Sequence, residues 1–170
     1  MSPTLRSARL LLDEYTPADE ESFVTLFGDE RVSRWMGDGP EPEAETRALF
    51  HRVFEVYGAN RFDVWAVRLD GRHVGHAELK RTEQVDGHEL IYALVPAVWR
   101  RGLGGEVART VLAYGFGTLG LDAVHATVAP ENTGSLALLA ALGFRHTQDI
   151  PEDDGGVTRV LRVTAAEVAR

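Results

Sequence analysis

The stretch Pro96-Ala97-Val98-Trp99-Arg100-Arg101-Gly102-Leu103-Gly104-Gly105-Glu106 decides the fold of this chain. It follows an alternating segment, residues 88–95, that is typical of a β-strand, and the proline ends that strand because it cannot donate to a sheet ladder. From Leu103 onward, apolar residues recur at helical spacing. A glycine-rich turn between a strand and a helix leaves successive backbone N–H groups unpaired at the positive end of the helix dipole. The stretch therefore predicts an anion-binding site, to which Arg100 and Arg101 add positive charge.

The glycines of this turn do not match either of two common nucleotide-binding patterns. The chain has no Gly-Lys-Ser/Thr that would make a P-loop, and no Gly-x-Gly-x-x-Gly follows the first strand of a βαβ unit. A nucleotide site of either type is therefore not expected. For the segment taken alone, a turn that simply starts a helix is the alternative to an anion site.

The segments on both sides of the turn predict an α+β domain. Strands are expected at residues 9–15, 62–69, 72–81, 88–95, 123–128, 144–149 and 157–163, helices at residues 16–27, 43–57, 103–118 and 132–142, and a breaker-rich loop at residues 37–42. Asp70-Gly71 predicts a hairpin, and Thr164 with Glu167 forms a capping box for a short terminal helix. The order β-α-α-β-β-β-α-β-α-β-β gives a mixed, mostly antiparallel central sheet flanked by helices. No linker divides the chain, so residues 1–170 are expected to form one domain.

Composition and charge narrow the class of protein. The 170 residues are 44% hydrophobic and 26% charged, with 26 acidic and 18 basic residues and no cysteine. The net charge of −8 disfavours nucleic acid as a partner, and the lack of cysteine excludes disulfides and a thiolate nucleophile. No apolar run approaches the roughly 20 residues of a membrane span, and no signal-peptide stretch opens the sequence. A cytoplasmic protein without a nucleic-acid or membrane partner is expected.

The acidity lies in the N-terminal third of the chain. Residues 1–60 hold 12 acidic and 6 basic side chains, a net charge of −6. Because such a surface attracts cations, Glu41, Glu43 and Glu45 are hypothesised to steer a cationic partner. The alternative is that these glutamates only solvate a helix and favour its N-terminal dipole.

Several motifs together resemble the GNAT superfamily of N-acetyltransferases. The segment Trp99–Gly104 is similar to the loop, usually written Q/R-x-x-G-x-G/A, that binds the pyrophosphate of acyl-CoA in that family. Trp99 departs from Gln or Arg, and an aromatic residue there is familiar in the ribosomal-protein (Rim-type) branch. Asn132-Thr133-Gly134-Ser135, followed by Leu142-Gly143-Phe144, resembles the N-x-x-S…LGF block of the family. The opening Arg9–Leu12 is similar to that branch as well, so the resemblance covers nearly the whole chain.

The resemblance implies a GNAT fold with acetyl-CoA as cosubstrate. The pyrophosphate would lie on the amides of the turn, and the pantetheine arm would pair with the exposed edge of residues 93–95 in the manner of strand addition. Asn132 would bond the pantetheine, cap the following helix, or do both. The expected cofactor-binding residues are Leu94, Val95, Arg100, Arg101, Gly102, Leu103, Gly104, Gly105, Asn132 and Ser135.

Acetyl transfer needs an acid for the leaving thiolate, a donor for the oxyanion and a base for the acceptor amine. Many GNAT relatives use a tyrosine as the acid, but the corresponding residue here is Leu139. Ser135, one turn earlier on the same helix, is the expected catalytic replacement, the alternative being a small residue packed beside the sheet. A backbone N–H near Leu94 would stabilise the oxyanion. Glu89 is the expected catalytic base, unless it is simply a solvated strand residue.

Two aromatic residues are expected to contact the acceptor. These are Trp35, between the two early helices, and Tyr92 on the strand before the turn. In an unbroken strand, Glu89 and Tyr92 face opposite sides of the sheet. No metal site is expected, because His73 and His76, three residues apart on one strand, would also face opposite sides.

The sequence therefore predicts an enzyme that transfers an acetyl group from acetyl-CoA directly to a primary amine. A protein N-terminal α-amine is the leading acceptor, and a small polyamine or aminoglycoside-like amine is the alternative. A non-catalytic acyl-CoA-binding module on the same fold is the rival interpretation. A homodimer is left open as a further partner.

Overall fold

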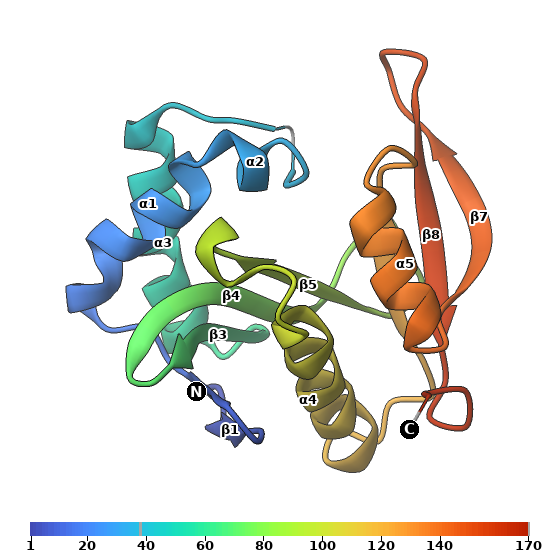
Figure 1. The fold of residues 1–170 in the computed structure, drawn as a ribbon, viewed down its shortest axis with the longest axis horizontal. Helices are drawn as coiled ribbons and strands as arrows, with labels where there is room; N and C mark the ends of the chain where they lie inside the picture. The colour runs from blue at the N-terminus through green and yellow to red at the C-terminus, as the bar shows by residue number, and fades with distance from the viewer. Residues whose placement is uncertain (38, 170) are drawn as a thin grey trace.

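Eight β-strands form one sheet in the computed structural model, which describes residues 1–37 and 39–169. Their order across the sheet is β1-β2-β3-β4-β5-β6-β8-β7, and within the described chain only β5 and β6 run parallel (Figure 1). The strands are β1 Leu5–Arg6, β2 Leu10–Asp13, β3 Asp63–Leu69, β4 Arg72–Arg81, β5 His88–Leu94, β6 Val124–Val128, β7 Arg145–Pro151 and β8 Val157–Val163. The predicted α+β class with a mixed, mostly antiparallel sheet is confirmed. Asp38, in the loop predicted at residues 37–42, lies outside the described residues.

Five α-helices of the described residues flank the sheet (Figure 1). They are α1 Glu20–Gly28, α2 Glu30–Ser33, α3 Glu43–Ala59, α4 Leu103–Gly117 and α5 Thr133–Ala141. On one face, Trp65 of the sheet shares a core with Val111 of α4 and Leu139 of α5. On the other face, Phe23 of α1 and Phe50 of α3 pack together over the sheet. Among the described residues, no helix combines the length and the apolar character that crossing a membrane requires.

The parallel pair β5 and β6 is short, and this opens a fork in the sheet. The register joins only His88 to Val124 and Glu89 to His125. Beyond that pair, β6 continues beside β8, while β5 runs on to Leu94 and the chain turns into α4. Among the described residues, no strand therefore pairs with the edge of β5 after Glu89 on its β6 side. The start of α4 lies beside this fork, and α5 lies across from it (Figure 1).

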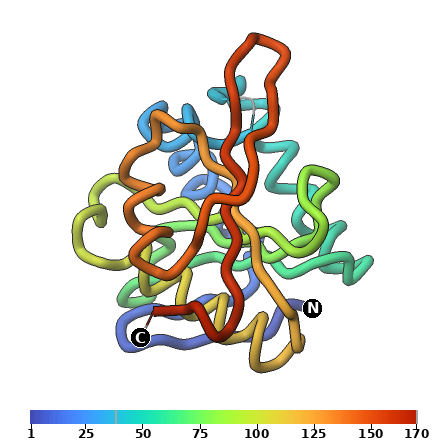
Figure 2. Tube along the Cα trace, turned by 90° about the vertical axis from the view of Figure 1, so that its right-hand side faces the viewer, coloured from blue at the N-terminus to red at the C-terminus, as the bar shows by residue number. Residues whose placement is uncertain are grey.

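A long hairpin forms the far side of the fork. Strands β7 and β8 pair antiparallel from Arg145 with Arg162 to Pro151 with Val157. Figure 2 shows the tip of this hairpin projecting beyond the rest of the chain. The hairpin and α2 stand on opposite sides of the fork (Figure 1).

Three short elements differ from the sequence prediction. Strand β1 and helix α2 have two and four residues, too few for a periodic pattern to show in the sequence. The predicted terminal helix is wrong. Thr164 N–H and Oγ1–H do donate to Glu167 Oε2, at 3.0 and 2.8 Å, but only a turn follows. The chain does not continue as a helix because Ala169 N–H donates instead to Leu142 O, at 3.0 Å.

The prediction that His73 and His76 face opposite sides of the sheet is also wrong. The register with β3 shifts between Val67 and Arg68, which places one extra residue in β4 and makes a β-bulge. Both imidazoles consequently reach the Tyr15 hydroxyl, with His73 Nε2 at 3.2 Å and His76 Nδ1 at 2.9 Å. Burial lowers the pKa of His73 to about 4, so its ring is neutral at pH 7.

Candidate active site

The turn after β5 holds a run of backbone N–H groups that the protein does not use. Among residues 1–37 and 39–169, no N–H of residues 100–105 donates a hydrogen bond to the protein, and the next one, Glu106 N–H, donates to Gly102 O at 3.2 Å. Arg100 and Gly102 have left-handed backbone conformations, with φ of 60° and 74°. Left-handed residues interspersed with right-handed ones turn successive N–H groups toward one concave side. Together with the α4 dipole, this turn can bind an anion.

The open edge of β5 adds further backbone donors. Val95 N–H donates to Val74 O at 2.9 Å, so the N–H on which a cofactor contact of Val95 would depend is already used by β4. Because successive strand residues present their backbone groups to opposite sides, the N–H and C=O of Leu94 point away from β4, into the fork, and those of Tyr92 point the same way. Trp99 Nε1–H donates to Leu94 O at 2.7 Å. At Leu94 this edge therefore offers the N–H alone to a ligand.

The start of α5 brings the Ser135 hydroxyl group to the fork, beside the Tyr92 hydroxyl group of β5. Asn132 Oδ1 accepts a hydrogen bond from Ser135 N–H at 3.2 Å, so Asn132 caps α5 as one of its two predicted roles requires. Ser135 Oγ lies 3.3 Å from Tyr92 Oη. Burial raises the pKa of Tyr92, and the hydrogen bond with Ser135 only partly offsets this. Both hydroxyls are therefore protonated at pH 7, and each has a proton to donate.

Glu89 is a buried carboxylate beside the same fork. Only 3% of the residue is exposed, which excludes the alternative of a solvated strand residue. Its Oε1 accepts a hydrogen bond from Thr127 Oγ1 of β6, and within the part of the chain that the structure describes no cation pairs with it. Tyr92 packs into the core with α4 and α5, and strand alternation places Glu89 on the opposite face of β5. The two side chains thus flank the fork from its two faces.

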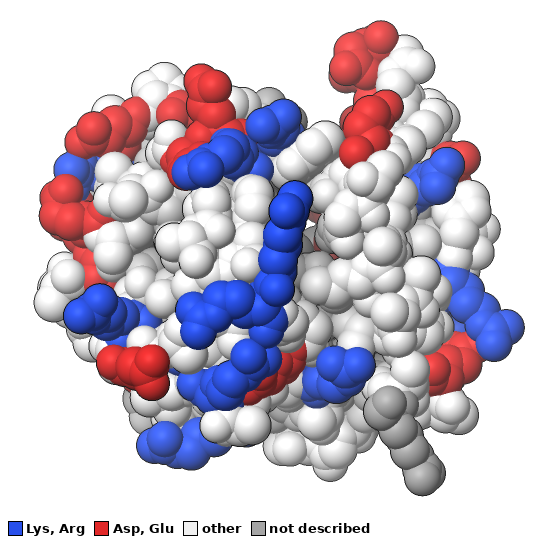
Figure 3. Space-filling model, in the orientation of Figure 1, with Lys and Arg blue, Asp and Glu red and all other residues white. Residues whose placement is uncertain are grey.

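One open cavity of about 740 Å³ joins these groups. The residues of the predicted site that line it are Trp35, Glu89, Tyr92, Leu94, Arg100, Gly102, Leu103, Gly104, Asn132 and Ser135. Val95, Arg101 and Gly105 do not line it. Lys and Arg side chains gather in the middle of the same face of the molecule, in front of the start of α4 (Figure 3).

A row of buried and partly buried polar side chains on β4 lies beside Glu89 and is already paired. Lys80, which lines the cavity, has its Nζ 2.7 Å from Glu78 Oε2, and Glu78 Oε1 lies 2.8 Å from His76 Nε2. Burial alone would raise the pKa of Glu78, but His76 and Lys80 outweigh burial and lower it to about 2. Lys80 is therefore already paired within β4, although it lies directly opposite Glu89 in the register of β4 with β5.

The three glutamates expected to steer a cationic partner lie away from the cavity. Glu41, Glu43 and Glu45 are exposed and do not line the cavity. Glu43 pairs with Arg47 at 2.8 Å. The hypothesis that these glutamates steer a cationic partner therefore has no support in their placement, and their position at the start of α3 agrees with the alternative of a solvated helix end.

A model of the family described as "Acetyltransferase (GNAT) domain" matches residues 9–145. The chain belongs to the GNAT acetyltransferase family. It is accordingly an N-acetyltransferase that depends on acetyl-CoA and acts on an amine-bearing acceptor, so the interpretation as a non-catalytic module is set aside.

Known proteins resemble this GNAT chain in sequence or in fold. The uncharacterized N-acetyltransferase YoaA of Bacillus subtilis (strain 168) is 29% identical over 152 residues, which cover 85% of this chain and 84% of that protein. A solved GNAT-family acetyltransferase from Bacillus anthracis is 24% identical with a TM-score of 0.82, covering 97% of this chain and 100% of that one. Mycobacterium smegmatis RimJ, solved in complex with CoA-disulfide, is 20% identical with a TM-score of 0.80, covering 99% and 88%. The predicted GNAT fold is confirmed.

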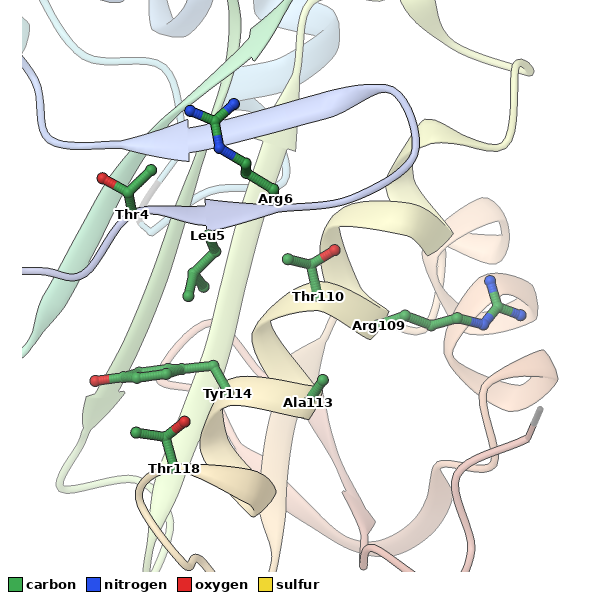
Figure 4. Close-up of a pocket in the computed structure, with 8 residues that line it drawn as sticks. All are labelled: Thr4, Leu5, Arg6, Arg109, Thr110, Ala113, Tyr114 and Thr118. Carbon is green, nitrogen blue, oxygen red and sulfur yellow. The ribbon is translucent and has the colours of Figure 1, made fainter.

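The GNAT chain has a second hollow, between β1 and α4 (Figure 4). It measures about 460 Å³ and is lined by Thr4, Leu5, Arg6, Arg109, Thr110, Ala113, Tyr114 and Thr118. None of the residues predicted for the site lines it. Its two charged side chains are both arginines, so it offers no carboxylate that could accept a proton from an amine.

Sequence reasoning misses three contributors to the GNAT site. Trp99 is noticed only as a departure from the family motif. Its indole N–H lies close to the end of β5 and donates to the carbonyl of Leu94, the last residue of that strand. Thr127 could have been found from the alternation of residues 123–128, which places it on the face opposite the core. Lys80 gives no signal in the sequence, because its role depends on the pairing of β4 with β5.

Proposed function

We propose that this acetyltransferase acts on protein N-terminal α-amines and belongs to the Rim-type branch that its sequence resembles. The observation that carries the proposal is the carboxyl group of Glu89, which lines the cavity and with which no cation of the described residues pairs. One buried carboxylate suits one ammonium group, because each compensates the desolvation of the other.

The other charged side chains near Glu89 support an acceptor that carries one positive charge. Lys80 is balanced by Glu78, and Arg31, which lines the cavity from α2, pairs with Asp29 at 2.7 Å. A polyamine would bring further positive charges to a wall that has no second free carboxylate among the described residues. A protein N-terminus brings one positive charge followed by a neutral backbone.

The residues at the mouth of the cavity support an acceptor amine that is attached to a polypeptide. Trp35 lines the mouth beside α2 and is 38% exposed. The molecule is notched between α2 and the β7–β8 hairpin, as the upper edge of Figure 3 shows. A polypeptide whose first residue reaches Glu89 can leave through this opening, and its next side chains can pack against the indole.

The residues at the fork fit acetyl-CoA. The free N–H groups of residues 100–105 would hold the pyrophosphate, and the edge of β5 at Leu94 would pair with the pantetheine amides. Asn132 keeps its side-chain N–H₂ available for the same arm while its Oδ1 caps α5. Bound acetyl-CoA supplies an activated thioester to the acceptor amine.

Three groups of the chain then act in order. Glu89 takes the proton of the ammonium group, directly or through one water, and so frees the lone pair of the amine. A backbone N–H of the β5 edge near Leu94 that the pantetheine leaves free donates to the oxygen that gains negative charge during the attack. The Ser135 hydroxyl donates its proton to the leaving sulfur and takes one back from water, which receives the second proton of the nitrogen, while the Tyr92 hydroxyl, 3.3 Å away, donates a hydrogen bond to Ser135 Oγ.

A small cationic amine is the alternative acceptor. A spermidine N-acetyltransferase from Vibrio cholerae, solved with CoA and spermine, shares this fold with a TM-score of 0.79 at 17% identity. At such an identity the likeness extends to the fold alone, as it does for RimJ.

The experiment compares acceptors by release of free thiol from acetyl-CoA. The acceptors are lysine-free peptides with different first residues, the same peptides blocked at the N-terminus, and spermidine. The proposal predicts that at least one free peptide has a higher kcat/KM than spermidine and that its blocked form is inactive. A kcat/KM for spermidine above that of every peptide would contradict it.

A further inference from the structure

Arg9 lies outside the cavity but is bonded to both ends of the turn that carries the free N–H groups. Its Nη1–H donates to Arg101 O at 3.0 Å. Its Nε–H donates to Glu106 Oε2 at 2.8 Å, and its Nη2 lies 2.7 Å from the same oxygen. Glu106 belongs to the first turn of α4. One guanidinium therefore bridges the turn and the helix that follows it.

Glu106 is anchored in turn on the connection between β1 and β2. Its Oε1 accepts from Ser7 Oγ–H at 2.6 Å and from Arg9 N–H at 2.8 Å. Burial alone would raise the pKa of Glu106, but the hydrogen bonds from Ser7 and Arg9 outweigh it and lower the pKa. Glu106 is thus ionised at pH 7, and the N-terminal hairpin is tied to the start of α4.

The bond to Arg101 O sets the direction of the next N–H. In a planar trans peptide, the C=O of Arg101 and the N–H of Gly102 point in opposite directions. With the carbonyl directed at Arg9, the Gly102 N–H points away from the hairpin, and Gly102 lines the cavity. The guanidinium lies against this glycine, because a Cβ built on Gly102 would be 3.6 Å from Arg9 Nη2.

We propose that Arg9 is a positioning residue for acyl-CoA binding, which directs the Gly102 N–H toward the pyrophosphate and holds the turn in its anion-binding conformation. Arg9 does not line the cavity, and Glu106 balances the charge of Arg9. Arg9 therefore acts by orienting the turn and not by attracting the pyrophosphate. The proposal rests on the proposed placement of the pyrophosphate on residues 100–105.

The test is the dissociation constant of CoA, measured by titration calorimetry on the wild type and on Arg9→Ala. Loss of one charge-assisted hydrogen bond predicts binding that is roughly 10-fold to 100-fold weaker. Arg9→Lys should restore at most part of the affinity, because an ammonium group lacks the planar fork that reaches Glu106 and Arg101 O together. Arg6→Ala is the matched control. It removes the same charge from the same hairpin at an exposed residue, and should leave the dissociation constant unchanged.

Kinetics with S-acetyl-pantetheine separate positioning from a general loss of structure. This thioester lacks the pyrophosphate, so Arg9→Ala should leave its kcat/KM unchanged while the KM for acetyl-CoA rises and kcat stays the same. An equal loss with both thioesters, or an unchanged dissociation constant for CoA in Arg9→Ala, would overturn the proposal. Full recovery of affinity in Arg9→Lys would overturn it too, because charge alone would then suffice.

The variant Gly104→Glu distinguishes a wrong role for Arg9 from a wrong placement of the pyrophosphate. If Gly104→Glu abolishes CoA binding while Arg9→Ala does not, the turn binds the pyrophosphate and only the role of Arg9 is wrong. If folded Gly104→Glu binds CoA as the wild type does, the pyrophosphate lies elsewhere and the basis of the proposal is gone.

Discussion

Gly104→Glu is the substitution that bears most directly on the cosubstrate site. Gly104 is the second residue of α4 and lines the cavity. A Cβ on Gly104 would lie 2.9 Å from Leu138 Cδ1 and 3.6 Å from Tyr92 Cε2. Both of these residues also line the cavity, so the glutamate side chain would point into it. The end of Leu138 is flexible and can move by the few tenths of an ångström required, so the variant is expected to fold.

The expected loss of affinity follows from charge repulsion. Two like charges about 4 Å apart repel by about 4 kcal/mol at the effective dielectric constant near a protein surface. A tenfold change in affinity corresponds to about 1.4 kcal/mol, so acetyl-CoA should bind roughly 10³-fold more weakly to Gly104→Glu.

The assay is calorimetric titration with CoA, accompanied by thermal unfolding to show that the variant is folded. Gly117→Glu, at the other end of α4, is the control. A Cβ on Gly117 meets no atom within 4 Å, and the residue is exposed, so CoA affinity should stay at the wild-type level. A folded Gly104→Glu whose affinity stays within about threefold of the wild type would refute this reasoning, because a single charge–charge contact exceeds that factor.

Three further predictions concern catalysis and stability. Ser135→Ala should lower kcat by ~10²–10⁴, the range for one positioned acid, with acetyl-CoA affinity nearly intact, as thiol-release kinetics will measure. Glu89→Gln should lower kcat by a similar ~10²–10⁴ at pH 7 and make the rate rise with pH as the free amine deprotonates unaided, which a pH–rate profile checks. Asp19→Asn should lower the free energy of unfolding by about 1–2 kcal/mol at pH 7, because hydrogen bonds from Arg68 and Thr16 outweigh burial and lower the pKa of Asp19 to about 2. Because that pKa is lowered in the folded state, the stabilisation is complete above the unfolded-state pKa of about 4 and is lost as the pH falls toward 2. The free energies of unfolding of the wild type and Asp19→Asn, measured with urea, should therefore converge near pH 2.

Each of these predictions has an outcome that would exclude it. A drop in kcat of less than about threefold in Ser135→Ala would leave water as the proton donor. A pH–rate profile of Glu89→Gln parallel to that of the wild type would place the base elsewhere. A difference in unfolding free energy that stays constant from pH 7 to pH 2 would show that Asp19 stabilises the fold without its charge.

The sequence predicts the longer elements because local patterns determine them. Asp70-Gly71 and the alternation around it fix the β3–β4 hairpin, and the helical spacing from Leu103 fixes α4. The bulge that turns His73 toward Tyr15 is not visible in this way. It depends on the register between two strands, and a one-residue slip reverses the face of every side chain after it.

The candidate site shows the same division between local and distant causes. Gly102 and Gly104 are recognised from the turn itself, and Glu89 from its strand. The burial of Glu89 and its bond to Thr127 arise only when β5 meets β6. The contact of Arg9 with Arg101 joins residues that are 92 positions apart, so no local pattern can reveal it.

Mass spectrometry of lysine-free peptides after incubation with the enzyme and acetyl-CoA shows whether a protein N-terminus is the acceptor. We expect at least one peptide to gain one acetyl group, located by fragmentation on the N-terminal α-amine, and this product to be lost when Glu89→Gln replaces the wild type. If every peptide stays unmodified while spermidine is acetylated under the same conditions, the N-terminal α-amine is not the acceptor.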